Sequence, residues 1–146
     1  IRVSRSGVVV SNGTHTDPIY RELEDGTSPI DALKTVLEKM GYERDQYNTP
    51  RIAGIVTPDK GYLGIIRDDG LEVTDFYLKD KSCKVICTYE LNHIEDEYHP
   101  FCGPSAIDAA KYVVHGGFFN TLEQPICSAA WLGGELAVYN PHEGEE

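Results

Sequence analysis

Two polar clusters carry the side chains of this chain that could do chemistry: VVVSNGTHTD at residues 8–17 and YERDQYNTPRIAG at residues 42–54. In the first cluster, three β-branched valines favour a strand, and Asn12-Gly13 is a strong turn signal. Three hydrogen-bonding side chains follow in a row, and Asp17-Pro18 is typical of a helix N-cap and a first helical residue. A strand end, a turn and a helix start would then converge, as they do at many ligand sites of α/β proteins. The alternative is a plain turn that leads into a well-capped helix.

The second cluster follows a helix that the pattern predicts at residues 29–40. Ser28 is the expected N-cap, apolar residues recur at helical spacing, and Gly41 is expected to end the helix in a left-handed conformation. Beyond this stop, Glu43 would be a buried acid or base, and Arg51, at the start of an apolar strand, would hold an anion. The alternative is that the charges of residues 43–45 form a solvated surface patch.

The composition describes one domain of a soluble globular protein, with 146 residues, 40% of them hydrophobic and 25% charged. The net charge of −11 argues against a broad nucleic-acid-binding surface. An anionic small substrate would need local arginine or lysine side chains, because the overall field opposes it. The sequence has no apolar run of membrane-span length and no signal-peptide pattern, so we expect a cytoplasmic protein without a membrane partner.

The four cysteines are expected to be reduced thiols, since nothing secretory accompanies them. A metal site is the sharper alternative, because four potential ligands lie close together in an irregular acidic loop. Their spacing matches no standard zinc pattern, so we predict no metal. These residues are His93, Glu97, His99 and Cys102.

The rest of the chain predicts a mixed α+β fold. Turn residues at 57–61, 68–70 and 133–134 separate neighbouring apolar runs, which indicates antiparallel hairpins. Hairpins flanked by helices imply antiparallel sheets with helices packed on an outer face. Strands are expected at residues 2–10, 51–56, 62–66, 71–77, 84–89, 126–132 and 136–139, and helices at residues 18–24, 29–40 and 106–115.

In this order, the two clusters resemble the archaeal-type inosine monophosphate (IMP) cyclohydrolase family, whose members close the second ring of the purine. The family motif SNGxHTD is matched at residues 11–17, Y-E-x-D at residues 42–45, and NTPRIA at residues 48–53. The resemblance is firm over residues 1–56 and looser to about residue 136. It implies a layered αββα sandwich of antiparallel sheets with outer helices, similar to that of the N-terminal-nucleophile hydrolases. Residues 1–146 would then be a single domain that lacks the N-terminal portion of the family.

The reaction that this resemblance implies joins the carboxamide nitrogen of 5-formamidoimidazole-4-carboxamide ribonucleotide to its formyl carbon and releases water. The attack is intramolecular and involves no redox or group-transfer step, so we expect no organic cofactor and no metal requirement. Glu43 would be the catalytic carboxylate, and Arg51 would bind an anionic or carbonyl oxygen. His15 could instead be a structural histidine with a satisfied partner. The resemblance assigns substrate binding and positioning to Asn12, Thr14, His15, Asp17 and Arg51.

The implied partner is a small purine nucleotide, with no nucleic acid and no membrane, and a homo-oligomer is left open. The tyrosine usually proposed as a catalytic donor in this family falls upstream of Ile1.

Two other functional classes stay open. One is a noncatalytic nucleotide-binding relative, against which Glu43 argues. The other is an amide hydrolase of the same layered architecture, which an amino-terminal Cys, Ser or Thr would support and Ile1 does not.

Overall fold

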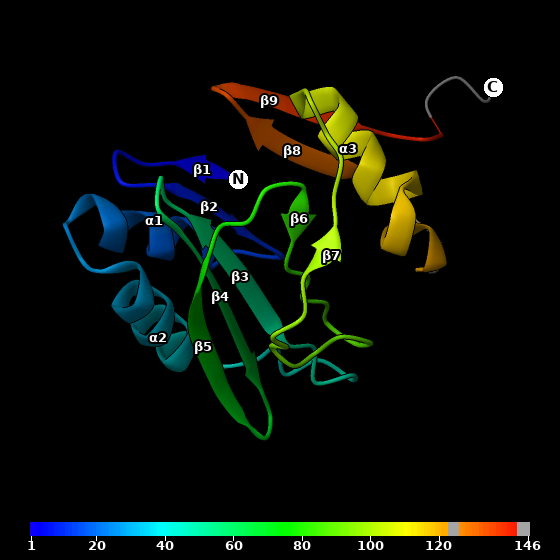
Figure 1. Cartoon of the computed structure of the whole chain (residues 1–146). Coiled ribbons are helices and arrows are strands. Elements are labelled where there is room, and N and C mark those ends of the chain that lie inside the picture. The colour runs from blue at the N-terminus through cyan, green and yellow to red at the C-terminus, as the bar shows by residue number, and fades with distance from the viewer. Residues whose placement is uncertain (123–125, 143–146) are drawn as a thin grey trace. The chain divides into compact units, whose positions relative to one another are not determined.

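The computed structural model describes residues 1–122 and 126–142 and divides the chain into two compact units. The first unit consists of Ile1–Leu78 with Val85–Asp96, and the second of Lys79–Lys84 with Glu97–Glu146. Figure 1 shows the elements of each unit. Both polar clusters fall in the first unit, which therefore holds all the candidate site residues.

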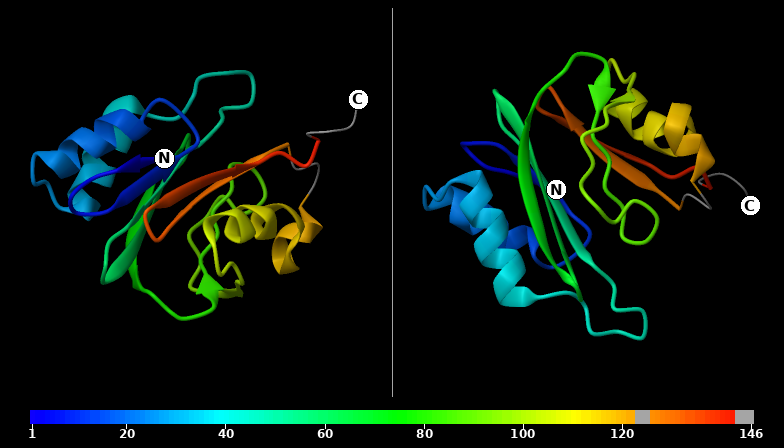
Figure 2. Two further views of the ribbon diagram at one scale, coloured as in Figure 1. Left: turned by 90° about the horizontal axis from the view of Figure 1, so that it is seen from above. Right: turned by 60° about the horizontal axis from the view of Figure 1, so that its bottom comes forward.

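An antiparallel sheet with strand order β1-β2-β3-β4-β5 forms the first unit. Both views of Figure 2 show helices α1 and α2 on the same face of this sheet. The strands are β1 (Arg2–Val3), β2 (Val8–Ser11), β3 (Arg51–Val56), β4 (Lys60–Arg67) and β5 (Gly70–Tyr77), and the helices are α1 (Thr16–Glu24) and α2 (Pro29–Met40).

The core of this unit lies between the sheet and its two helices. On β3, Ala53 and Ile55 are buried while Val56 is exposed, as expected for a strand with one face toward the core. Gly64 on β4 lets α2 pack closely, because a Cβ there would lie 2.8 Å from Leu37 Cδ1. The buried apolar residues of the core are Val9, Ile19, Leu23, Ala32, Leu33, Val36, Leu37, Ala53 and Ile55.

The predicted ends of α2 are confirmed. Ser28 is the N-cap, and its hydroxyl accepts a hydrogen bond from the Asp31 N–H at 3.2 Å. Gly41 is the C-cap with φ +66° and ψ −175°, so its φ is positive as expected. Its ψ lies outside the left-handed helical region, in a conformation that is essentially limited to glycine.

The single strand predicted at residues 2–10 is wrong, because the structure forms a hairpin of β1 and β2 there. The turn at residues 4–7 is held by Ser4, whose hydroxyl donates to the Gly7 carbonyl at 2.8 Å and accepts from the Gly7 N–H at 3.0 Å. Serine side chains compete for backbone groups in this way, so a locally bonded turn replaces an extended chain.

Helix α1 begins two residues earlier than predicted, and its N-cap is His15 rather than Asp17. The His15 side chain makes no capping hydrogen bond. Pro18 is tolerated inside the first turn, because the first N–H groups of a helix have no intrahelical acceptor to lose. Asp17 lies in the same turn, where a negative charge is favourable next to the helix dipole.

The strand predicted at residues 84–89 is also wrong. The structure has only the short strand β6 (Ser82–Cys83), which pairs with β7 (His99–Pro100) in the second unit. The chain passes from the second unit to the first after Lys84, and the Cys87 N–H bonds locally to the Leu91 carbonyl at 2.9 Å. The Cys87 N–H therefore finds its partner in a loop rather than in a sheet.

In the second unit, α3 (Ala106–His115) packs against a hairpin of β8 (Ser128–Leu132) and β9 (Glu135–Tyr139). Ser105 caps α3 as predicted, the 3₁₀ helix η1 (Gly117–Thr121) follows it, and Gly133 and Gly134 form the hairpin turn with φ of +61° and +92°. Each unit combines antiparallel strands with helices, which confirms the α+β class. No helix within residues 1–122 and 126–142 combines the length and apolar character needed to cross a membrane.

Candidate functional site

Asn12 joins the end of β2 to the start of β3. Its side-chain carbonyl oxygen accepts from the Ile52 N–H at 3.0 Å, and its side-chain amide donates to the Pro50 carbonyl at 3.1 Å. The Asn12 backbone N–H also donates to the Ile52 carbonyl at 3.4 Å. Asn12 therefore continues the β2–β3 ladder with its side chain and holds the backbone on both sides of Arg51.

His15 is fully buried behind this turn, with 0% of its surface exposed. Its Nε2 lies 2.9 Å from the Ile52 carbonyl, and because a carbonyl can only accept, Nε2 carries the proton. Burial lowers the pKa of His15, and the nearby Arg51 charge lowers it further against the opposing effect of the Ile52 carbonyl. His15 is thus a neutral imidazole near pH 7, with its proton on Nε2.

Arg51 and Glu43 form an ion pair, in which Arg51 Nη1 donates to Glu43 Oε1 at 2.9 Å. The Arg51 side chain is 15% exposed and that of Glu43 is 40% exposed. One expectation is therefore corrected, because Glu43 is half-exposed rather than buried, whereas Arg51 is mostly buried. Arg44 and Asp45 are exposed, as the surface-patch alternative expects, whereas Glu43 pairs with Arg51 across the loop.

Asp45 folds the loop that returns Glu43 to Arg51. Its carboxylate accepts from the backbone N–H groups of Tyr47 and Thr49, both at 3.0 Å, and from the Thr49 hydroxyl at 2.6 Å. The Thr49 hydroxyl lowers the pKa of Asp45 most, so this carboxylate stays ionised. The Glu43 N–H closes the loop by donating to the Thr49 carbonyl at 2.8 Å.

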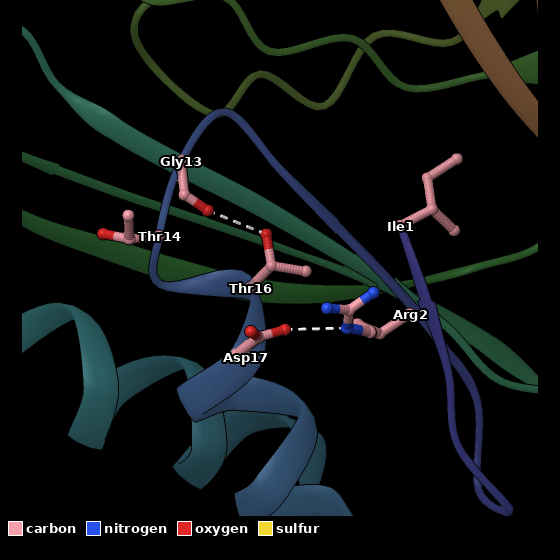
Figure 3. A pocket seen from close by; sticks show the side chains of 6 residues that line it. All are labelled: Ile1, Arg2, Gly13, Thr14, Thr16 and Asp17. Atoms are coloured by element: carbon pink, nitrogen blue, oxygen red, sulfur yellow. Dashed lines mark hydrogen bonds and ion pairs between the residues drawn. The ribbon is translucent and has the colours of Figure 1, made fainter.

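A pocket of about 380 Å³ opens beside the Asn12-Gly13 turn. Figure 3 shows the turn residues on one side and Arg2 on the other, with the Arg2 guanidinium reaching Asp17. Arg2 Nε donates to Asp17 Oδ1 at 2.7 Å, and this bond lowers the pKa of Asp17. The pocket is lined by Ile1, Arg2, Gly13, Thr14, Thr16 and Asp17.

Gly13 lines this pocket and also lies close to the buried side chains of His15 and Arg51. A Cβ at Gly13 would lie 3.4 Å from His15 Nδ1 and 3.5 Å from Arg51 Nη1. Among the side chains of residues 1–122 and 126–142, two buried polar atoms lack a hydrogen-bond partner, and they are His15 Nδ1 and Arg51 Nε. Both belong to this site, although buried polar groups elsewhere are normally satisfied.

The structure therefore brings four of the six candidate residues into one cluster: Asn12, His15, Glu43 and Arg51. Thr14 and Asp17 line the adjoining pocket instead. Sequence reasoning missed two supporting residues. Asp45 had a usable signal, because Asp followed closely by polar residues favours a local turn. Arg2 had none, because its ion pair with Asp17 depends on how β1 lies beside α1.

His93 has a structural role in the described chain. Its Nδ1 bonds Glu72 Oε1 at 2.8 Å, and Arg67 Nη2 donates to the same oxygen at 2.7 Å. Arg67 also donates to the Asn92 carbonyl at 2.6 Å, which fixes this loop to the sheet. Across residues 1–122 and 126–142 no group of three His, Cys, Asp or Glu side chains is arranged to hold a metal. The four cysteines are free thiols.

The turn between a strand and a helix, with its ionisable residues and pocket, has the features of a small-molecule enzyme site. The pattern of the family described as "IMP cyclohydrolase-like protein" matches residues 1–135. The chain belongs to this family, which confirms the resemblance found in its motifs. It is therefore identified as an enzyme of the IMP cyclohydrolase type.

Curated relatives agree with this assignment. The IMP cyclohydrolase of Methanothrix thermoacetophila is 42% identical over 145 residues, which cover 97% of this chain and 70% of the relative. The IMP cyclohydrolase of Methanocella arvoryzae is 38% identical over 146 residues, covering 96% of this chain and 69% of the relative. That of Halobacterium salinarum is 37% identical over 130 residues, covering 88% and 62% respectively.

Proposed function

We propose that this site closes the purine ring, converting 5-formamidoimidazole-4-carboxamide ribonucleotide to IMP with release of water. The observation that carries the proposal is the location of the two unsatisfied buried atoms, His15 Nδ1 and Arg51 Nε, beside the Arg51–Glu43 ion pair. One atom is an acceptor and the other a donor. Such a pair suits a ligand that presents both kinds of group, as a carboxamide does.

In the proposed mechanism, the carboxamide nitrogen attacks the formyl carbon, so one C–N bond forms. Glu43, which is 40% exposed and open to a ligand, accepts the proton that the nitrogen loses. Arg51 stabilises the negative charge that develops on the formyl oxygen. The protonated carboxylate returns this proton to the oxygen, which becomes a hydroxyl group. The formamido nitrogen then gives up its own proton, which the carboxylate passes to the hydroxyl group, so a C=N double bond forms as the C–O bond breaks and water leaves.

The remaining candidates would hold the substrate in a reactive conformation, which supplies much of the acceleration in an intramolecular attack. Thr14 and Asp17, at the mouth of the pocket, would contact the nucleotide directly. Neutral His15 is fully buried, so it would support the site through its hydrogen bond to the Ile52 carbonyl without adding charge to the centre. The step is balanced without an oxidant, a reductant or a transferred group, so it requires neither an organic cofactor nor a metal.

For the architecture, we propose the layered αββα sandwich implied by the family. Support comes from the first unit, in which a sheet carries its helices on one face, and from the second, in which α3 packs on the β8–β9 hairpin. We also propose a cytoplasmic location, because a phosphorylated substrate of this kind does not cross a membrane unaided. A homo-oligomer remains compatible with this proposal.

One assay separates the three candidate functions by the product that forms. The complete purified protein, with the segment upstream of Ile1, serves as the parent in all activity assays. It is mixed with the formamido nucleotide, and nucleotides and formate are separated by chromatography. A cyclohydrolase yields IMP without formate, an amide hydrolase yields the 5-amino nucleotide with formate, and a noncatalytic relative leaves the substrate unchanged. Substrate labelled with ¹⁸O in the formyl group should give unlabelled IMP. Formate, or an unchanged substrate, would refute the proposal.

A further inference from the structure

The Asn12 side chain bonds the backbone on both sides of Arg51. Its oxygen accepts from the Ile52 N–H at 3.0 Å and its amide donates to the Pro50 carbonyl at 3.1 Å. These two backbone groups belong to the residues immediately before and after Arg51. A side chain that is hydrogen-bonded to Pro50 and to Ile52 restricts the backbone torsions of Arg51 between them.

Further hydrogen bonds among the residues that the structure describes support the backbone on the Ile52 side of Arg51, but not on the Pro50 side. The Ile52 carbonyl accepts from His15 Nε2 at 2.9 Å and from the Asn12 N–H at 3.4 Å. For the Pro50 carbonyl, the Asn12 amide is the partner found in the described chain. Loss of the Asn12 side chain would therefore free the Pro50 side of Arg51, while the Ile52 side would keep two of its bonds.

The orientation of Arg51 matters because it sets the positions of two nitrogens of the side chain, Nη1 and Nε. Nη1 is committed to Glu43 Oε1 at 2.9 Å, and the buried Nε has no partner. A rotation of the backbone at residue 51 would move both atoms, so it would break the ion pair or displace the donor left over for a ligand.

We propose that Asn12 is a positioning residue, which acts on the reaction through Arg51 and does not bind the nucleotide itself. This inference rests on the proposed function and changes the role that sequence reasoning gave to Asn12. An amide suits this position, since it supplies both a donor and an acceptor for the two flanking backbone groups.

A double-mutant cycle tests the proposal. The variants are Asn12→Ala, Arg51→Ala and the double variant. The readouts are kcat/KM and the Kd of IMP. The Kd is measured by NMR titration, so that weak binding remains measurable. In the parent, Asn12→Ala should lower kcat/KM about ten- to a hundredfold, the effect of losing two hydrogen bonds. In the Arg51→Ala background, the same change should alter kcat/KM and the Kd of IMP less than about twofold. Equal effects in both backgrounds would show that Asn12 contacts the nucleotide and would overturn the proposal.

A second readout does not depend on activity. The Arg51 Nε–Hε group can be followed by ¹⁵N relaxation, and its order parameter should fall in Asn12→Ala. Asn140→Ala is the matched control, because Asn140 also bonds a backbone N–H, that of His142 at 2.9 Å, but lies in the second unit. An unchanged Arg51 order parameter in Asn12→Ala would count against the proposal.

Two safeguards keep the outcome readable. Denaturant unfolding confirms that each variant is folded under assay conditions, and Asn12→Ser replaces Asn12→Ala if the latter is unfolded. If the parent forms no IMP, the proposed function fails, whereas the relaxation experiment still decides whether Asn12 positions Arg51. If the parent is active and the mutational effects add, the inference fails and the function stands.

Discussion

Arg51 has the most constrained side chain of the site, since its backbone is held by Asn12 and its guanidinium by Glu43. Its side chain is only 15% exposed, so the charge is partly removed from water. Charge-assisted bonds in such surroundings are stronger than those on an open surface. The affinity of the site for an anionic or carbonyl oxygen should therefore depend on this one residue.

Arg51→Ala should weaken IMP binding by about 1.5–3 kcal/mol, the usual loss of a charge-assisted hydrogen bond. Because Arg51 is largely buried, we also expect some loss of folding stability, which denaturant unfolding would measure separately. Arg44→Ala is the control, since Arg44 is exposed in the same loop. Equal calorimetric affinities for IMP in Arg51→Ala and the parent would make Arg51 a purely structural residue.

His15 should make the stability of the protein depend on pH. Burial lowers the pKa of folded His15, so the unfolded chain binds the proton more readily. The stabilisation is fully present above the unfolded pKa of about 6.5 and is lost as the pH falls from there toward the folded pKa. The slope contributed by one such group cannot exceed about 1.4 kcal/mol per pH unit.

The measurement is urea unfolding between pH 5 and pH 7.5 in the parent and in His15→Gln, whose amide can still donate to the Ile52 carbonyl. The variant should lose part of the decline in stability below about pH 6.5. His142→Gln, at an exposed histidine, is the control variant. If His15→Gln and the parent show the same slope, then His15 is not the group that titrates.

At the scale of elements, α2 spaces the two polar clusters along the chain, and its ends are set by local chemistry. Ser28→Ala should cost about 0.5–2 kcal/mol of unfolding free energy, because the Asp31 N–H would lose its side-chain acceptor. Thr35→Ala, on the exposed side of α2, should change stability by less than about 0.5 kcal/mol. The affinity for IMP should stay that of the parent in both. A weaker affinity in Ser28→Ala would mean that α2 takes part in the site.

Sequence reasoning succeeded for elements whose ends are encoded locally. The bounds of α2 and α3 agree with the predicted ranges, because Ser28, Ser105 and Gly41 act within one helical turn, and the bounds of β3 also agree. It failed where tertiary partners decide. The β1–β2 hairpin and the loop after β6 could not be read from propensity, because strand-like residues are common to both outcomes.

The candidate site shows the same division. Motifs identified residues of the right chemical types, but the motifs could not say which of them touch. The Arg51–Glu43 pair depends on a loop that Asp45 folds, and the burial of His15 depends on α1 beginning at Thr16. Arg2 lines the pocket because β1 pairs with β2 in an antiparallel hairpin. The local turn at Asp45 had a sequence signal, but contacts between distant residues follow from packing and carry none in a single sequence.

At the scale of the whole molecule, acidic residues outnumber basic ones, with 24 Asp and Glu against 13 Lys and Arg. The arginines nearest the site are balanced by carboxylates, Arg2 by Asp17 and Arg51 by Glu43. A binding site for an anionic nucleotide must then rely on short-range contacts, since the net field repels anions. This favours a small ligand held in a pocket over an extended nucleic acid.

Glu43→Gln tests the central claim most directly, because the change keeps the shape of the side chain and removes only its ability to take up a proton. IMP formation is followed in single-turnover mixtures treated with a chelator, with Glu38→Gln on the exposed side of α2 as the control. We expect the parent and Glu38→Gln to form IMP equally fast without added metal or folate. Glu43→Gln should be slower by roughly 10²–10⁴-fold, the usual contribution of general acid–base catalysis, while its IMP affinity changes little. A Glu43→Gln rate within about threefold of the parent, or a parent that forms IMP only when a metal is restored, would contradict the account.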